Sequence, residues 1–86
     1  MIDIEYVGRL KSELGLESDK EQLDWQSEIT SVASLIDLLC NERGTQWTTT
    51  LLQENLMISV NQSMVKVDHP IEDGDSLIFF PPIAGG

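Results

Sequence analysis

The 86-residue chain carries 15 acidic and 5 basic side chains, which give a formal net charge of −10. Its length fits one domain with a modest core, and its hydrophobic content of 41% is typical of a folded protein. The negative charge disfavours binding to nucleic acid or to an anionic membrane surface, and it favours a partner protein with a basic surface.

The first part of the chain predicts two strands. Apolar residues alternate with acids from Ile2 to Tyr6, as in a half-buried strand. A helical turn over residues 9–14 should end at Gly15. Leu23 and Trp25 then alternate with polar residues, which predicts a second strand.

The clearest helix begins after Ser31, a residue typical of helix N-caps, and should end at Gly44. The apolar side chains within it recur at the spacing of one helix face: Val32, Leu35, Ile36 and Leu39. A shorter helix is predicted between Gln46 and Glu54, although three threonines lower its propensity. Its apolar side chains would be Trp47, Leu51 and Leu52.

Three further strands are predicted in the last third of the chain. Residues 56–60 and 64–67 are apolar segments joined by a turn at 61–63, and a turn at Asp73-Gly74 precedes a closing strand over 76–80. One sheet of about five strands must then cover its apolar face with the single good helix. The sequence therefore predicts an α+β roll compatible with the ubiquitin-like β-grasp, with a domain over residues 1–80 and a flexible, extended tail over residues 81–86.

Both ends of the chain and its cysteine content favour a cytoplasmic protein. Acids follow Met1 where a secretory signal would carry bases. The last apolar segment is too short for a membrane span and is interrupted by Pro81 and Pro82. Cys40 is the only cysteine, so no disulfide can form within the chain, as expected in a reducing compartment.

Other candidate sites for chemistry are weak. Cys40 lies on the clearest helix and the only histidine, His69, lies in a connection between strands, so we expect Cys40 to be a buried or half-buried apolar residue rather than a nucleophile. The acids around Gly74 lack EF-hand spacing, because Phe80 falls where the acidic twelfth ligand belongs. No phosphate-binding loop is present. We expect a solvated acidic turn, no metal site and no nucleotide bound by this chain.

The C-terminal tail carries the most specific chemistry. Pro81 and Pro82 can continue neither a central strand nor a helix interior, so residues 81–86 should extend roughly 20 Å from the body. Gly85 and Gly86 lack side chains, so a narrow channel of another protein can admit them and place the terminal carboxylate beside a reactive centre. A frayed glycine-rich end is the alternative, but it does not require the preceding prolines and phenylalanines.

Phe79 and Phe80 are adjacent on a predicted strand, so their side chains point to opposite faces of the sheet and only one can enter the core. We predict that Phe80, which precedes the tail, faces a partner, because aromatic residues commonly anchor interfaces. Trp25 and Trp47 are instead expected to be core or half-buried packing residues.

Three segments of the last third carry a specific resemblance. They are Asn61-Gln62, the run Asp68-His69-Pro70-Ile71-Glu72-Asp73-Gly74-Asp75, and the run Phe79-Phe80-Pro81-Pro82-Ile83-Ala84-Gly85-Gly86. Together they resemble the small-subunit family of molybdopterin synthase, whose members are sulfur carriers with a β-grasp fold and a mixed sheet. A diglycine end alone is also found in ubiquitin and in the carriers for thiamine and tRNA thiolation. The preceding Phe-Phe-Pro-Pro favours the molybdopterin synthase family among these.

The resemblance implies a non-catalytic carrier within a sulfur-transferase complex, a heterotetramer in the family. There, an adenylating and sulfurating partner uses ATP to activate the terminal glycine, which corresponds to Gly86, and a sulfur donor converts it to a thiocarboxylate. The tail then inserts into the large subunit, where the sulfur is donated to a cyclic pterin precursor to build the molybdopterin dithiolene. The tail residues are Pro81, Pro82, Ile83, Ala84 and Gly85. The catalytic acids and bases belong to the large subunit, and this chain is expected to bind no cofactor. Because nothing follows Gly86, we expect no proteolytic maturation.

Three alternatives stay open. A carrier for thiamine or tRNA thiolation would use the same terminal chemistry. A ubiquitin-like covalent modifier would be joined to lysines through Gly86. A plain interaction module would use no terminal chemistry, so a residue added after Gly86 would leave it active, whereas the same addition would abolish a carrier.

Overall fold

The computed structural model describes residues 1–82, and the predicted tail residues Ile83, Ala84, Gly85 and Gly86 lie outside the described residues. The described part forms five strands and three helices: β1 (Ile2–Tyr6), α1 (Leu10–Glu13), β2 (Lys20–Leu23), α2 (Val32–Arg43), α3 (Thr45–Leu51), β3 (Met57–Val60), β4 (Ser63–Val65) and β5 (Ser76–Phe80). No helix within residues 1–82 combines the length and apolar character needed to cross a membrane.

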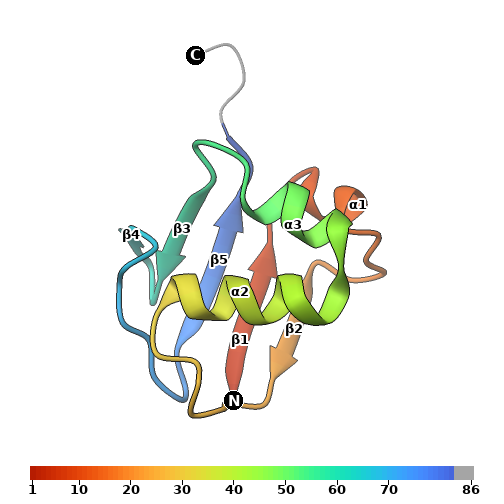
Figure 1. Ribbon diagram of the computed structural model, residues 1–86. Helices are drawn as coiled ribbons and strands as arrows, with labels where there is room; N and C mark the ends of the chain where they lie inside the picture. The colour runs from red at the N-terminus through yellow and green to blue at the C-terminus, as the bar shows by residue number, and fades with distance from the viewer. Residues whose placement is uncertain (83–86) are drawn as a thin grey trace.

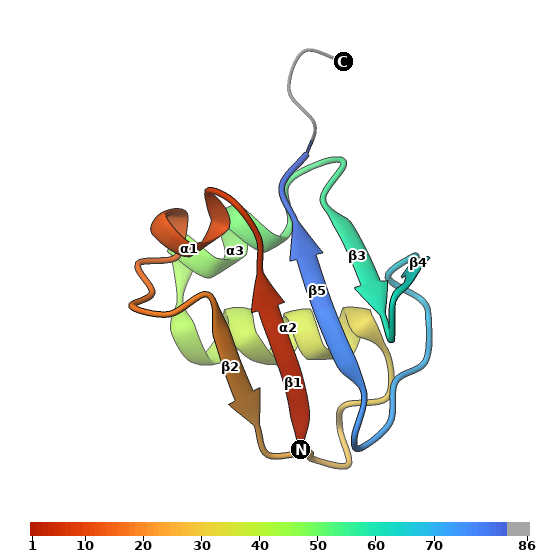
Figure 2. The same ribbon diagram turned by 180° about the vertical axis from the view of Figure 1, so that it is seen from behind.

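The strands form one mixed sheet in the order β2-β1-β5-β3-β4. β1 and β5 are parallel, and the remaining neighbours are antiparallel. The helices cover one face of the sheet, with α2 lying across it (Figure 1), and the other face stays open (Figure 2). The predicted α+β roll with a ubiquitin-like β-grasp arrangement is confirmed.

β1 has the predicted alternation, and β2 is shorter than expected. Ile2, Ile4 and Tyr6 are buried. β2 ends at Leu23, which pairs with Ile2, the first residue of β1. Because β1 offers no partner for a longer strand, the chain leaves the sheet and the side chain of Trp25 is 38% exposed. The predictions that Trp25 belongs to the strand and packs in or against the core were wrong.

α2 begins and ends where the sequence predicts. The Ser31 hydroxyl accepts a hydrogen bond from the Ser34 backbone N–H (3.2 Å), and the Ser34 hydroxyl accepts one from the Ser31 N–H (2.9 Å). This reciprocal pair satisfies two donors at the helix start. At the other end Gly44 has φ +93°, a conformation that glycine adopts without strain, and its N–H donates to the Cys40 carbonyl. The predicted apolar face is buried as expected: Val32, Leu35, Ile36 and Leu39.

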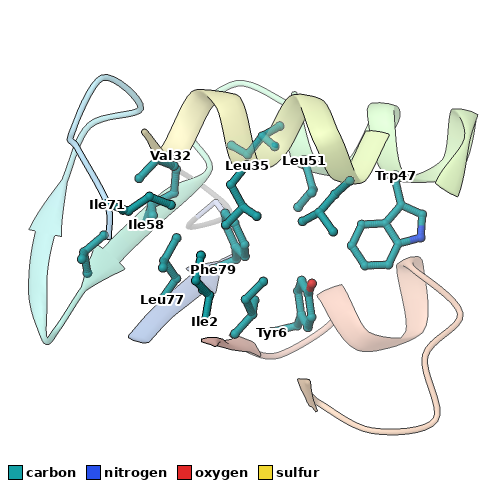
Figure 3. Close-up of a cluster of buried hydrophobic side chains, with 14 of the residues drawn as sticks. Ile2, Tyr6, Val32, Leu35, Trp47, Leu51, Ile58, Ile71, Leu77 and Phe79 are labelled. Atoms are coloured by element: carbon teal, nitrogen blue, oxygen red, sulfur yellow. The ribbon is translucent and has the colours of Figure 1, made fainter. Parts of the chain in front are cut away.

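The core lies between the sheet and the helices. Figure 3 shows Ile2, Tyr6, Leu77, Phe79 and Ile58 from the strands meeting apolar side chains of α2 and α3. These helical side chains include Val32, Leu35, Trp47 and Leu51. α3 ends earlier than predicted, so Leu52 is 58% exposed and does not contribute the expected packing.

The turn between β3 and β4 fixes the start of β5. Asn61 and Gln62 form a two-residue connection in which both have positive φ, 50° and 73°, as in a type I′ hairpin turn. The Asn61 side chain donates to Asp75 Oδ1 and accepts from the Ser76 N–H, both at 3.0 Å. Asn61, part of the motif noticed in the sequence, therefore ties the β3–β4 hairpin to β5.

Candidate functional site

β5 delivers the tail from the centre of the sheet. It pairs with β1 on one side and β3 on the other, and it ends at Phe80. Pro81 packs beside Gly8, which has φ +63°, and a β-carbon at Gly8 would lie 3.4 Å from Pro81 Cγ. Glycine thus allows the positive φ of the turn after β1. The first tail residue, Pro81, lies directly beside this turn.

Phe79 and Phe80 point to opposite faces of the sheet, as predicted. Phe79 is 0% exposed and its ring stacks on Tyr6, with 5.7 Å between the ring centroids. Phe80 is half-buried on the open face. Its placement suits the partner-facing ring predicted from the sequence, and its part in binding stays a prediction.

Phe80 belongs to an apolar groove that we define by Met57, Met64, Phe80 and Pro81. Its volume is ≈ 260 Å³. Met57 lies directly opposite Phe80 in the β3–β5 pairing, and Met64 lies on the adjacent strand β4. Sequence reasoning missed Met57 and Met64, because only the strand register brings them beside Phe80. The groove adjoins the root of the tail.

The remainder of the open face is charged. Strand pairing places Glu5 beside Lys20 on one side and Ile78 on the other. Next to this row, the Gln22 amide donates to Asp3 Oδ1 at 2.8 Å. A hollow of ≈ 460 Å³ with a mixed polar and apolar lining lies over these strands, and its polar residues include Asp3, Glu5, Lys20 and Gln22. The open face therefore has an apolar half over β5, β3 and β4, and a charged half over β1 and β2.

A polar network on the covered side of the sheet braces β1 and β2 against the helices. Glu21 on β2 accepts hydrogen bonds from the Tyr6 hydroxyl (2.6 Å) and from both terminal nitrogens of Arg43 (2.7 and 2.8 Å). Arg43 lies 4.5 Å over the Trp47 ring, and Trp47 meets Tyr6 edge-on at 5.6 Å. The network joins β1, β2, α2 and α3 through side chains far apart in sequence, which no local pattern could reveal.

Burial and hydrogen bonding shift the pKa values of this network. Burial raises the pKa of Tyr6 above its usual range, and the bond to Glu21 adds to this effect. Burial also acts to raise the pKa of Glu21, but the hydrogen bonds from Arg43 and Tyr6 outweigh it and hold that pKa below its ordinary value. The carboxylate of Glu21 is thus an anion at neutral pH, committed to structure rather than to proton transfer.

The weaker sites considered in the sequence do not assemble. Cys40 is half-buried on α2, as expected. The His69 carbonyl accepts from the Val32 N–H at the start of α2, whereas Cys40 lies eight residues further along, about 12 Å of helix away. This separation excludes a Cys40–His69 dyad.

Two carboxylates of the acidic turn around Gly74 bind groups of the protein itself. Asp75 Oδ2 accepts from the Glu72 N–H at 2.8 Å, and Asp73 pairs with the N-terminal ammonium of Met1. Within the described part of the chain, no group of three or more histidine, cysteine or acidic side chains is placed to hold a metal ion.

The chain was compared with models of known protein families, and one family matches it. The model of the ThiS family matches residues 4–86, almost the entire chain. The chain belongs to the ThiS family. This match and the two curated relatives below confirm the resemblance predicted from the last third of the chain.

Within the ThiS family, the chain is similar to two curated proteins of the same name. It is 46% identical over 41 residues to the molybdopterin synthase sulfur carrier subunit of Escherichia coli K12, covering 48% of this chain and 51% of that protein. It is 31% identical over 45 residues to the protein of the same name from Haemophilus influenzae, covering 52% and 56%. The chain thus spans about half the length of the curated relatives it matches.

A solved structure extends the likeness over the full length. The chain matches one in the crystal structure of the BexX/CysO complex of Amycolatopsis orientalis, with a TM-score of 0.71, 19% identity and 100% coverage of both chains. At this identity the likeness shows the shared fold. That structure is a complex of BexX with CysO.

Proposed function

We propose that this chain is the sulfur carrier subunit of a molybdopterin synthase. The observation that carries the proposal is the ThiS family match, which runs through the Phe-Phe-Pro-Pro motif to Gly86. The names of the two curated relatives support the choice of pathway. Residues 1–80 act as the folded domain and residues 81–86 as the tail, in the cytoplasm.

The terminal carboxylate of Gly86 must be activated before it can carry sulfur. A free α-carboxylate has a pKa of about 3.5, so it is an unreactive anion at neutral pH. An adenylating partner joins it to AMP from ATP, releasing pyrophosphate, and a sulfur donor then displaces AMP to leave a thiocarboxylate. The large subunit of the synthase supplies the catalytic groups, and the thiocarboxylate sulfur attacks the cyclic pterin precursor. This chain binds no cofactor itself.

The body of the chain positions the tail for these partners. Phe79 anchors the end of β5 in the core, Pro81 lies beside the turn at Gly8, and the prolines direct the chain away from the sheet. The residues Pro81, Pro82, Ile83 and Ala84 provide the reach, and Gly85 and Gly86 enter the partner's active site.

The large subunit covers the apolar groove when it receives the tail. Pro81 belongs to both the groove and the tail, so a protein that encloses the tail also passes over Phe80. The charged half of the open face and the net charge of −10 suit a basic rim on that protein. Phe80 is the aromatic anchor of this interface.

Reconstitution tests the proposal. The thiocarboxylated chain, mixed with a molybdopterin synthase large subunit and the cyclic pterin precursor, should form molybdopterin. One alanine added after Gly86 should abolish both charging and product. One alanine added before Met1 is the matched control and should leave both intact, because only the exposed pair with Asp73 is disturbed.

Each alternative has its own signature in this assay. A carrier for thiamine or tRNA thiolation would acquire the thiocarboxylate but would not yield molybdopterin. A covalent modifier would give lysine adducts that survive denaturants. A plain interaction module would bind partners equally well with the added alanine. Any of these three results would contradict the proposal.

A further inference from the structure

Two of the three methionines lie in the apolar groove, and the third lies far from it. Met57 is 39% exposed and Met64 is 54% exposed. Met1 is 53% exposed, close to Met64 and more than Met57, but its carbonyl accepts from the Gly74 N–H before β5 begins. Phe80 is at the other end of β5, about 20 Å away. The chain therefore carries two methionines in the groove and one exposed methionine outside it, Met1, that serves as a control.

We infer that Met57 and Met64 are oxidation sites whose conversion to sulfoxide in the free chain weakens its binding to the partner that receives the tail. This inference rests on the proposed function, because the occupant of the groove is the large subunit that encloses the tail. The groove is continuous with Pro81, so a protein bound to the tail covers both thioethers.

The reaction requires a hydroperoxide and no other group. A lone pair of the thioether sulfur attacks the distal peroxide oxygen, a sulfur–oxygen bond forms and the O–O bond breaks. Sulfur loses two electrons, and the peroxide is reduced to water or an alcohol, which retains the proton. The side chain changes from a flexible apolar group to a polar one, which disrupts methionine-rich contacts. A thiol-dependent methionine sulfoxide reductase reverses the step.

The free protein tolerates this change and the complex does not. Both side chains are exposed in the free chain and lie outside the core, so water can reach the new sulfoxide groups. A covering partner would remove water from them. Met57 lies directly opposite Phe80, at the predicted anchor of the interface. Burial of a polar group without a hydrogen-bond partner should weaken binding about tenfold for each sulfoxide.

Binding before and after peroxide treatment tests the inference. The chain is treated with hydrogen peroxide, the occupancy of sulfoxide at each methionine is read by peptide mass mapping, and affinity for the large subunit is measured by calorimetry. Oxidation at both Met57 and Met64 should weaken binding about a hundredfold, and sulfoxide reductase should restore it. In the preformed complex, both sites should oxidise more slowly than in the free chain, whereas Met1 should oxidise at its free rate.

A double variant isolates the two sites. Met57→Leu combined with Met64→Leu conserves volume and cannot be oxidised, so it should bind equally before and after peroxide. Because this variant keeps Met1, Cys40 and both tryptophans, loss of binding by it after treatment would overturn the inference. Unchanged affinity of the oxidised parent chain, or unprotected thioethers in the complex, would overturn it while leaving the proposed function intact. Failure of the untreated chain to bind would overturn both.

Discussion

Adjacent phenylalanines at the end of β5 should have opposite roles, and alanine substitutions separate them. Phe79 is 0% exposed and stacked on Tyr6, so Phe79→Ala should cost about 3–5 kcal/mol of unfolding free energy. A chain of 86 residues has a total stability of about 4–13 kcal/mol. The substitution therefore removes a large part of the total.

Phe80→Ala should leave stability nearly unchanged and weaken binding. Phe80 is half-buried on the open face, so its truncation should cost about 1 kcal/mol of stability. If it anchors the interface, its loss should cost at least about 2 kcal/mol of binding, or roughly thirtyfold in the dissociation constant for the large subunit.

Urea unfolding followed by tryptophan fluorescence measures the loss of stability in each variant, because Trp47 is buried against Tyr6. With a slope of about 1–2 kcal/mol per molar urea, the midpoint for Phe79→Ala should fall by about 2 M or more, whereas that for Phe80→Ala should fall by less than about 1 M. Calorimetric titration with the large subunit measures the loss of binding affinity in Phe80→Ala. Equal losses of stability would refute the assignment of the two rings to opposite faces. Unchanged affinity of Phe80→Ala would refute the groove as the interface.

Three further predictions concern the network, the hairpin and the net charge. The folded-state pKa of Glu21 lies below its ordinary value, so its pair with Arg43 stabilises the fold above about pH 4.3 and is lost as pH falls through the folded-state pKa. Glu21→Gln should therefore lower the free energy of unfolding by about 1–3 kcal/mol at pH 7, and this difference from the parent chain should shrink in acid. The control Glu28→Gln, at an exposed position, should change stability little. A difference that stays constant with pH in urea titrations would contradict this prediction. Gln62→Gly should raise stability by about 0.5–1 kcal/mol, because φ +73° strains glutamine, and a lower midpoint than the parent would show that the turn is not strained. Affinity for the large subunit should fall as ionic strength rises above about 0.1 M, and constant affinity would exclude a role for the net charge of −10.

Local patterns were sufficient for most elements of the fold. The N-cap at Ser31 and the apolar spacing to Leu39 identified α2, because capping and helical periodicity depend only on nearby residues. Alternation identified β1, and Asp73-Gly74 marked the turn before β5. The extension of β2 to Trp25 failed because strand length depends on the partner strand, and β1 begins at Ile2.

Features that depend on register could not be predicted. Alternation showed that Phe79 and Phe80 face opposite ways, but the faces were identified only by the pairing of β5 with β1 and β3. The β3–β5 and β3–β4 pairings bring Met57 and Met64 into the groove. The Tyr6–Glu21–Arg43 contacts join three distant segments, so they leave no short-range signal. The tail, by contrast, was recognisable from sequence because its chemistry resides in consecutive residues.

The central claim is that Gly86 carries sulfur, and an intact mass measurement tests it most directly. The chain is incubated with ATP, a sulfur donor and an activating enzyme for sulfur carriers, and the C-terminal peptide is then fragmented. We expect a mass gain equal to the replacement of one oxygen by sulfur, localised to Gly86 and absent when ATP is omitted. No gain under conditions that charge an established sulfur carrier in parallel would contradict the account.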